Sequence, residues 1–196
     1  FIPIFINKLI NFYTELIKNY KKMITMDFKK IDNLVLVIGK TEGHLDQSIF
    51  ARSILSEKKG PPPEINLFNE KNNGETILKL IEERLIESAH DISLGGIIIA
   101  LARMCIKGNK GVKLNKLKSL INKFQYFFGE DQGRYIIEIT KDNLKKVKEI
   151  LNNNSVHYDE LAIVVEKDII IDEEPILSVD ELMLYSKKWL KEYMVQ

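Results

Sequence analysis

The chain has 196 residues, of which 29 are basic and 28 acidic, so its net charge is +1. This length suits one domain, with or without an extra segment, that can bury a sizeable core. The balanced charge gives no sign of a nucleic-acid partner. The single cysteine, Cys105, falls in an apolar helical pattern, and we expect an inert core thiol in a reducing, cytoplasmic protein.

Residues 1–22 are predicted to be an N-terminal extension, either helical or disordered, that precedes a domain at 23–196. The extension carries apolar residues at helical spacing, at Phe5, Leu9, Phe12 and Leu16. Its apolar start is too short to span a membrane and lacks the features of a signal peptide, so no membrane partner is expected. The first residue is Phe1 rather than Met, which suggests a processed chain or part of a longer reading frame.

The rest of the chain alternates strand and helix patterns. In chain order, we predict a strand at 33–39, a helix at 46–56, an irregular proline-containing connection at 58–66, helices at 73–87 and 95–106, strands at 112–114 and 134–139, a helix at 143–151, strands at 161–165 and 169–171, and a helix at 179–193. The last two strands are predicted to form a hairpin. These patterns favour an α/β (α+β) fold with a mixed sheet layered with helices.

The most informative stretch, residues 88–96, places His90, Asp91 and Ser93 beside the pair Gly95 and Gly96. Glycines allow a backbone or a phosphate to approach closely, and the helix that starts there offers free N–H groups to an anion. Asp91 is a candidate Mg²⁺ ligand at this helix start. The alternative is that Asp91 or Ser93 only caps the helix.

The loop after the first predicted strand contains His44, Gln47 and Ser48, which suit a ligand-binding loop. The alternative is an ordinary helix cap formed by Asp46 or Ser48. The three histidines of the chain lack the spacing of a zinc site. The sequence contains neither a P-loop nor a dinucleotide-binding glycine motif, so a nucleotide would need another type of site.

A second polar stretch contains Glu130, Asp131, Gln132 and Arg134, directly before the predicted strand 134–139. A carboxylate beside an amide can bind ribose hydroxyls or an amide substrate. Equally, Asp131 and Arg134 can form a local salt bridge of small value. We expect the two polar stretches to meet at one edge of the sheet.

Taken together, the sequence resembles the synthetase subunit of phosphoribosylformylglycinamidine synthase over about residues 17–196. The resemblance is carried by motifs at 39–48, 61–63, 88–96 and 128–135 and by Trp189-Leu190 near the end. That family makes formylglycinamidine ribonucleotide from formylglycinamide ribonucleotide, ATP and glutamine in purine biosynthesis. The resemblance implies that this chain is the last of four domains, a C-terminal domain of the aminoimidazole ribonucleotide synthase type, and that residues 1–22 are a remnant of the preceding one.

The resemblance also implies ATP and Mg²⁺ as cofactors of the intact enzyme. The implied partners are the remaining domains of the synthase, or glutaminase and small accessory subunits. The family's catalytic histidine and metal ligands lie mainly in other domains, so no catalytic residue is assigned here and the isolated chain is expected to be inactive. Glu130-Asp131-Gln132 resembles the counterpart of a Glu-Ser-Gln substrate motif and would face an auxiliary nucleotide site. The alternatives are a related ATP-dependent synthase, or a non-catalytic remnant or docking subunit.

Overall fold

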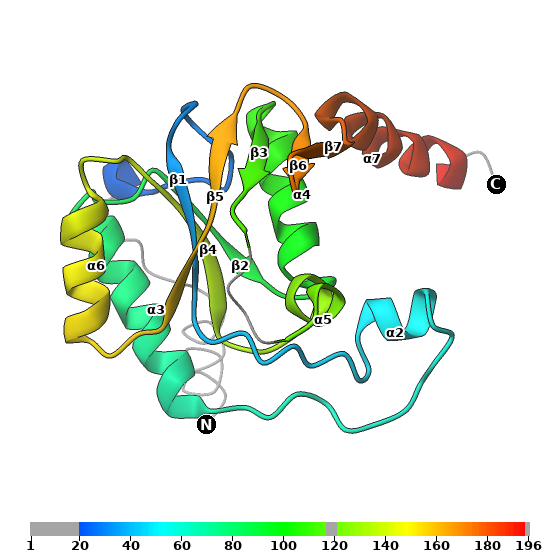
Figure 1. The fold of residues 1–196 in the computed structure, drawn as a ribbon, viewed down its shortest axis with the longest axis horizontal. Helices are drawn as coiled ribbons and strands as arrows, with labels where there is room; N and C mark the ends of the chain where they lie inside the picture. Colours follow the sequence, from blue (N-terminus) through cyan, green and yellow to red (C-terminus); the bar gives the residue numbers. More distant parts are fainter. Residues whose placement is uncertain (1–19, 117–120, 195–196) are drawn as a thin grey trace, which may run out of the picture.

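A mixed sheet of seven strands forms the centre of the computed structural model, which describes residues 20–116 and 121–194 (Figure 1). The strand order is β2-β4-β1-β5-β3-β6-β7, and every neighbouring pair is antiparallel except β3 and β6. The strands are β1 (Leu34–Ile38), β2 (Ser88–Ile92), β3 (Gly111–Leu114), β4 (Arg134–Ile139), β5 (Tyr158–Val165), β6 (Ile169–Ile171) and β7 (Glu174–Leu177). The predicted α/β class with a mixed sheet is confirmed.

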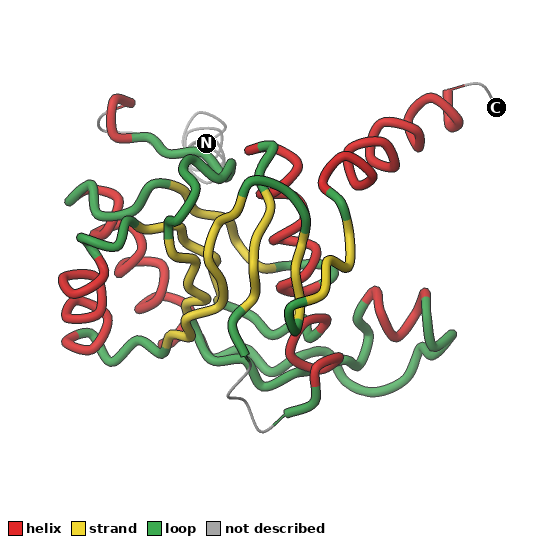
Figure 2. Tube along the Cα trace, turned by 45° about the horizontal axis from the view of Figure 1, so that its top comes forward, coloured by secondary structure: helices red, strands yellow, loops and turns green. Residues whose placement is uncertain are grey.

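Helices lie on both sides of this sheet, as the tube in Figure 2 also shows. They are the 3₁₀ turn η1 (Tyr20–Lys22) and the helices α2 (Ile49–Ser53), α3 (Leu67–Glu82), α4 (Gly96–Gly108), α5 (Lys123–Phe128), α6 (Leu144–Asn153) and α7 (Val179–Met194). Helices α3 and α6 cover one face, whereas α4 and α5 lie on the other (Figure 1). None of the helices in the described ranges is long and apolar enough to cross a membrane.

Strand β1 shows why the sheet needs cover on both faces. Its side chains alternate between two cores: Val35 and Val37 join the core under α4, and Leu36 and Ile38 join the core under α3 and α6. All four are fully buried. An uninterrupted apolar run of this kind is typical of a strand that is buried on both sides.

The predicted hairpin between the last two strands is wrong. Strand β3 lies between β5 and β6, antiparallel to one and parallel to the other. A Cβ on Gly111 would lie 2.0 Å from the Asp168 carbonyl oxygen, so glycine lets β3 pass close to the chain that joins β5 to β6. The real hairpin joins β6 to β7 through Asp172 and Glu173, both with positive φ, as a tight two-residue hairpin turn requires.

Several helix boundaries also differ from prediction. Helix α3 begins six residues before the predicted start, because Asn66 accepts a hydrogen bond from the Asn69 N–H as its N-cap, and it ends at Glu82. Helix α2 is shorter than predicted and is capped by Ser48. Helix α5 and strands β2 and β7 were not among the predicted elements. Most of the predicted extension, residues 1–19, lies outside the described part of the chain.

Candidate functional site

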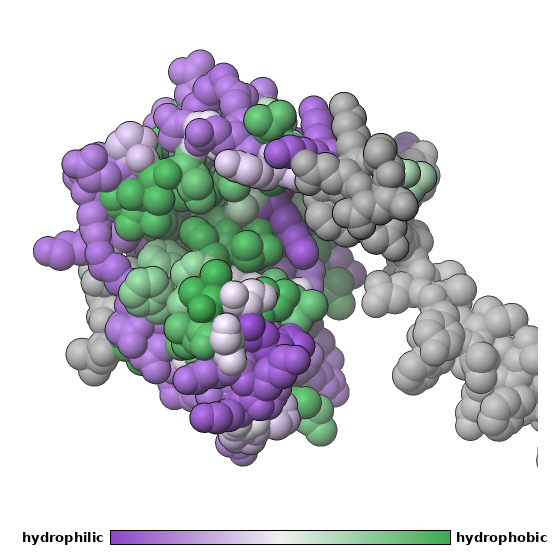
Figure 3. Space-filling view, turned by 90° about the vertical axis from the view of Figure 1, so that its right-hand side faces the viewer, coloured by the Kyte–Doolittle hydropathy of each residue, from purple (hydrophilic) through white to green (hydrophobic). Residues whose placement is uncertain are grey.

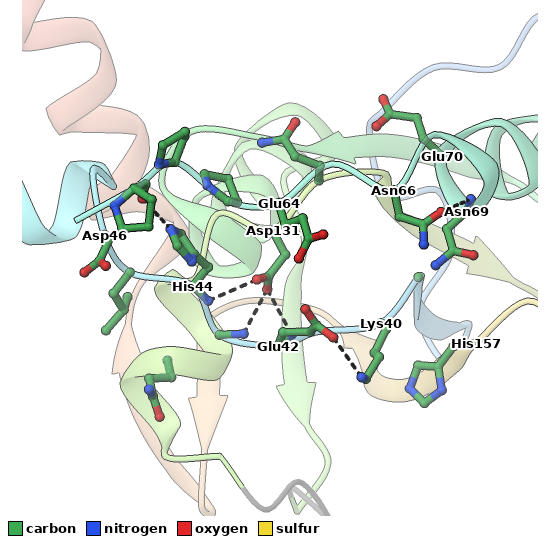
Figure 4. Close-up of a pocket in the computed structure, with 18 of the residues that line it drawn as sticks. Lys40, Glu42, His44, Asp46, Glu64, Asn66, Asn69, Glu70, Asp131 and His157 are labelled. Carbon is green, nitrogen blue, oxygen red and sulfur yellow. Dashed lines mark hydrogen bonds and ion pairs between the residues drawn. The ribbon is translucent and has the colours of Figure 1, made fainter.

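A pocket of about 1010 Å³ opens where the chain leaves β1 (Figure 4). The loop that follows β1 forms one wall, the start of α3 forms another, and the proline-containing segment between α2 and α3 crosses over the opening. Of the predicted site residues, His44, Asp131 and Gln132 line this pocket. The structure thus joins the second polar stretch to the loop after the first strand.

Asp131 fixes the shape of that loop. Its buried carboxylate accepts hydrogen bonds from the backbone N–H groups of Glu42, Gly43 and His44 at 3.0–3.1 Å (Figure 4). Three converging N–H groups form the kind of concave backbone site that binds anions. Because the Asp131 carboxylate occupies it, this backbone site is already satisfied from within the protein.

Arg134 holds the Asp131 segment and the loop after β1 together. It is 1% exposed, and its guanidinium donates to the carbonyls of Asp131 and Gly129 and to the Thr41 hydroxyl. Its Nη1 atom lies 3.5 Å from the Asp131 carboxylate. Burial lowers the pKa of Arg134, and the charge of Asp131 opposes that shift. The Asp131–Arg134 contact, one of the two alternatives for this stretch, is therefore present within a larger buried network.

Glu130 joins the two predicted polar stretches. Its Oε1 atom accepts from the N–H of Ile49 at the start of α2 and from the N–H of Gly95 before α4, both at 2.8 Å. Its own N–H donates to the His44 carbonyl. We expected an anion at the glycine-rich start of α4, and the Glu130 carboxylate occupies that position. A negative charge there is favoured by the positive end of the helix dipole.

The predicted residues of the loop after β1 have two different structural roles: two hold a neighbouring segment, and one caps α2. His44 Nε2 lies 3.0 Å from the Pro61 carbonyl oxygen, and Gln47 Nε2 donates to the Gly60 carbonyl. These two side chains fasten residues 57–65, which we call the strap, across the pocket. Ser48 is fully buried and caps α2, so the capping alternative holds for Ser48.

The pocket lining also contains residues that sequence reasoning missed. Helix α3 contributes Asn69, Glu70 and Asn73, its N-cap residue is Asn66, and His157 comes from the chain before β5 (Figure 4). Asn73 donates to the Gly133 carbonyl at 2.9 Å. These polar residues could not be linked to the loop after β1 from spacing, because only the fold brings them to one place.

The pocket is more acidic than basic. The Lys40 ammonium is paired with Glu42 at 2.8 Å, whereas Asp46, Glu57, Glu64 and Glu70 also line the wall. Amides and carboxylates provide hydrogen-bonding groups for hydroxyl or amide groups of a ligand. A bare phosphate would instead need a cation or more basic residues.

The first polar stretch begins with β2, an edge strand of the sheet. Strand β2 pairs with β4, with Asp91 opposite Tyr135, so the two predicted stretches do meet at an edge. His90 and Asp91, however, line a separate pocket of about 880 Å³. His90 Nδ1 lies 3.0 Å from the Asp91 carboxylate, and its Nε2 is buried with no hydrogen-bond partner among the described residues.

The remaining predicted residues of that stretch shape the backbone. The Ser93 carbonyl accepts from the Gly96 N–H, and Gly95 and Gly96 both have positive φ. A Cβ on Gly96 would lie 2.6 Å from the Phe127 carbonyl oxygen, so glycine allows α4 to start against the end of α5. In the core under α4, burial raises the pKa of the Cys105 thiol to about 12, as an unreactive cysteine requires.

With the fold and pocket described, comparison with known proteins defines the class. The family profile of the AIR synthase related protein, C-terminal domain, matches residues 30–194, and the chain belongs to this family. Over 179 residues the chain is 65% identical to the phosphoribosylformylglycinamidine synthase subunit PurL of Pelagibacter ubique and 36% identical to that of Bartonella bacilliformis. The resemblance drawn from the motifs is confirmed.

These matches cover 91% of this chain but 24% of each relative, so the chain spans about a quarter of their length. Among solved structures, Thermotoga maritima PurL complexed with FGAR superposes with a TM-score of 0.66 at 20% identity, over 84% of this chain and 30% of that one. A thiamine-monophosphate kinase from Stenotrophomonas maltophilia reaches 0.52 at 12% identity, over 78% and 54% of the two chains. Identities this low establish the shared fold alone.

Proposed function

We propose that this chain serves as the C-terminal domain of a phosphoribosylformylglycinamidine synthase in purine biosynthesis. The observation that carries the proposal is the 65% identity to a PurL subunit over 179 residues. The relatives are named as PurL subunits of phosphoribosylformylglycinamidine synthase. The resemblance implies a ligase that uses formylglycinamide ribonucleotide, ATP and glutamine-derived ammonia. In this proposal the domain acts in the cytoplasm as part of that larger assembly, with its other domains, a glutaminase and small accessory subunits as partners.

The pocket beneath the strap is the proposed nucleotide or substrate contact. Gln132 is exposed at its wall, next to the anchored Asp131, and can exchange hydrogen bonds with a ribose or an amide. ATP binding is proposed because Thermotoga maritima PurL is known complexed with ATP. His44 and Gln47 contribute by holding the strap, whereas Glu130 and Arg134 hold the loops in place.

Mg²⁺ belongs to the proposal only as a companion of bound phosphate. Asp91 is a lone carboxylate whose side chain is 65% exposed. Within the described ranges no three His, Cys, Asp or Glu side chains gather as a metal site, so these residues do not by themselves fit a resident metal ion. Mg²⁺ is often held by one or two carboxylates together with substrate phosphates, and Asp91 remains a candidate for one such ligand.

A chimeric enzyme tests the proposed function. The matched 179-residue stretch of Pelagibacter ubique PurL is replaced by that of this chain, and formation of amidine product from formylglycinamide ribonucleotide, ATP and ammonia is measured. We expect an active chimera and a silent isolated chain. Gln132→Ala should lower kcat/KM roughly threefold to tenfold, the value of one or two hydrogen bonds.

The matched control is Asn152→Ala, an exposed amide at the end of α6 that should leave the rate unchanged. A folded chimera without activity would overturn the proposal in favour of a non-catalytic or differently specific domain. Substrate-dependent ADP release by the isolated chain, surviving every purification step and lost on Asp91→Ala, would contradict the expectation that the chain is silent alone.

A further inference from the structure

Helix α5 is apolar on opposite sides although only one side is packed. Tyr126 and Phe127 are buried in the core under α4, whereas Phe124 is 61% exposed. The exposed Phe124 ring lies next to Lys123, which is also exposed. An exposed aromatic ring on this short helix is the first part of an uncovered apolar surface.

Neighbouring elements extend that surface. The ring centroids of Phe50 and Phe128 lie 4.6 Å apart, and that of Phe124 lies 5.9 Å from Phe50. Ile54, one helical turn after Phe50, is 68% exposed. Three aromatic rings thus cluster at the junction of α2 and α5.

The start of α4 continues the same surface. Gly96 touches the backbone of residues 127–129, which holds the beginning of α4 against the end of α5. Leu94 and Ile99 there are 55% and 39% exposed. Figure 3 shows apolar side chains gathered on the side of the molecule that carries α2, α4 and α5. We call this surface the aromatic face and define it by six residues, Phe50, Ile54, Leu94, Ile99, Phe124 and Phe128.

We propose that the aromatic face is the docking surface for the part of the synthase subunit that lies outside the matched quarter. This inference rests on the proposed function. The PurL relatives carry about three quarters of their length beyond the matched stretch, so a large partner of the same protein exists to cover the face. Phe124, Ile54, Leu94 and Ile99 are exposed and adjoin the half-buried rings of Phe50 and Phe128, and an apolar surface on three adjoining elements marks an interaction site rather than scattered surface residues.

Binding in trans tests the proposal without any substrate. The full 196-residue chain is titrated into Pelagibacter ubique PurL that lacks its matched stretch, and the Kd is measured by calorimetry. Phe124→Asp should weaken binding at least tenfold. The control is Leu78→Asp on α3, across the sheet, because Leu78 is equally exposed at 61% and lies outside the aromatic face.

Hydrogen exchange provides a second measurement that does not depend on the shortened partner folding. Amides of residues 123–128 should exchange at least tenfold more slowly in the chimera than in the isolated chain, while those around Leu78 should not change. Equal exchange, or equal binding by Phe124→Asp and wild type, would overturn the proposal. A wild-type dimer that Phe124→Asp dissociates would also overturn it, because the occupant would then be a second copy. A chimera that forms product without protection at 123–128 separates failure of this inference from failure of the proposed function.

Discussion

Glu138 is a buried carboxylate on which several distant segments depend. It is fully buried in β4, and its two oxygens accept from the N–H groups of Lys29 and Lys30, the Asn33 amide and the Ser88 hydroxyl. The carboxylate therefore ties the segment before β1 to strands β4 and β2. A buried charge of this kind is tolerated only when hydrogen bonds satisfy it.

Replacing Glu138 by Gln should lower the free energy of unfolding by about 2–4 kcal/mol. The amide keeps the size of the side chain but replaces one acceptor with a donor, so buried donors lose their partner. Urea unfolding followed by circular dichroism measures the change. Glu149→Gln, at an exposed position of α6, is the control and should change the free energy by less than about 0.5 kcal/mol. Equal midpoints for the two variants would contradict the role given to Glu138.

At the scale of single residues, the sequence indicated which polar side chains are important better than it indicated their hydrogen-bond partners. A local salt bridge between Asp131 and Arg134 was one of two alternatives for this stretch, and the two side chains do lie within 3.5 Å. The three N–H groups on Asp131 come from residues almost 90 positions away, so local spacing could not reveal them. Glu138 gave no signal at all, since one charged residue in an apolar strand is equally compatible with an exposed position.

The strap is the least supported element around the pocket. In the described chain, residues 58–65 make no backbone-to-backbone hydrogen bonds, and nearly all of them are exposed. The side chains of His44 and Gln47 hold its Pro61 and Gly60 carbonyls. Segments with few backbone hydrogen bonds and little burial open at low free energy.

The double variant His44→Ala/Gln47→Ala should release the strap. Loss of two hydrogen bonds, each worth about 1 kcal/mol, should raise local opening roughly fivefold to thirtyfold. Brief trypsin treatment should then cut faster at Lys58 and Lys59, while the melting temperature stays close to that of wild type. Lys40→Ala serves as the control, since Lys40 lines the same pocket and pairs with Glu42. Unchanged cleavage by the double variant would show that the strap is held by other contacts.

Elements were predicted well where apolar periodicity was long and poorly where tertiary contacts decide. Strands β1 and β4 stand out because five or six successive residues favour the strand state. Helix α5 has six residues and apolar groups on both sides, so its periodicity is weak. Strand β7 is exposed along its whole length, and the insertion of β3 between β5 and β6 depends on a pairing that no local pattern specifies.

At the scale of the whole molecule, the segment before β1 contributes side chains to the cores on both faces of the sheet. Phe28 is 1% exposed in the core under α4, and Met26 packs against that core. Ile24 packs against the other core. Within the described part of the chain, which starts at residue 20, these are the first residues of either core, and we propose the boundary between an extension and a domain at 23–196.

Two N-terminal deletions test that boundary. Removing residues 1–22 takes away the hydrogen bond from Lys22 to the exposed Glu82 carbonyl, and we expect the melting temperature to remain nearly unchanged. Solubility should rise, because the deleted sequence carries a row of apolar side chains. Removing residues 1–28 also removes Phe28, whose backbone contacts Gly108, and should cost about 3–5 kcal/mol or unfold the domain. If the shorter deletion already unfolds the protein, residues before position 23 belong to the core and the domain starts earlier than proposed.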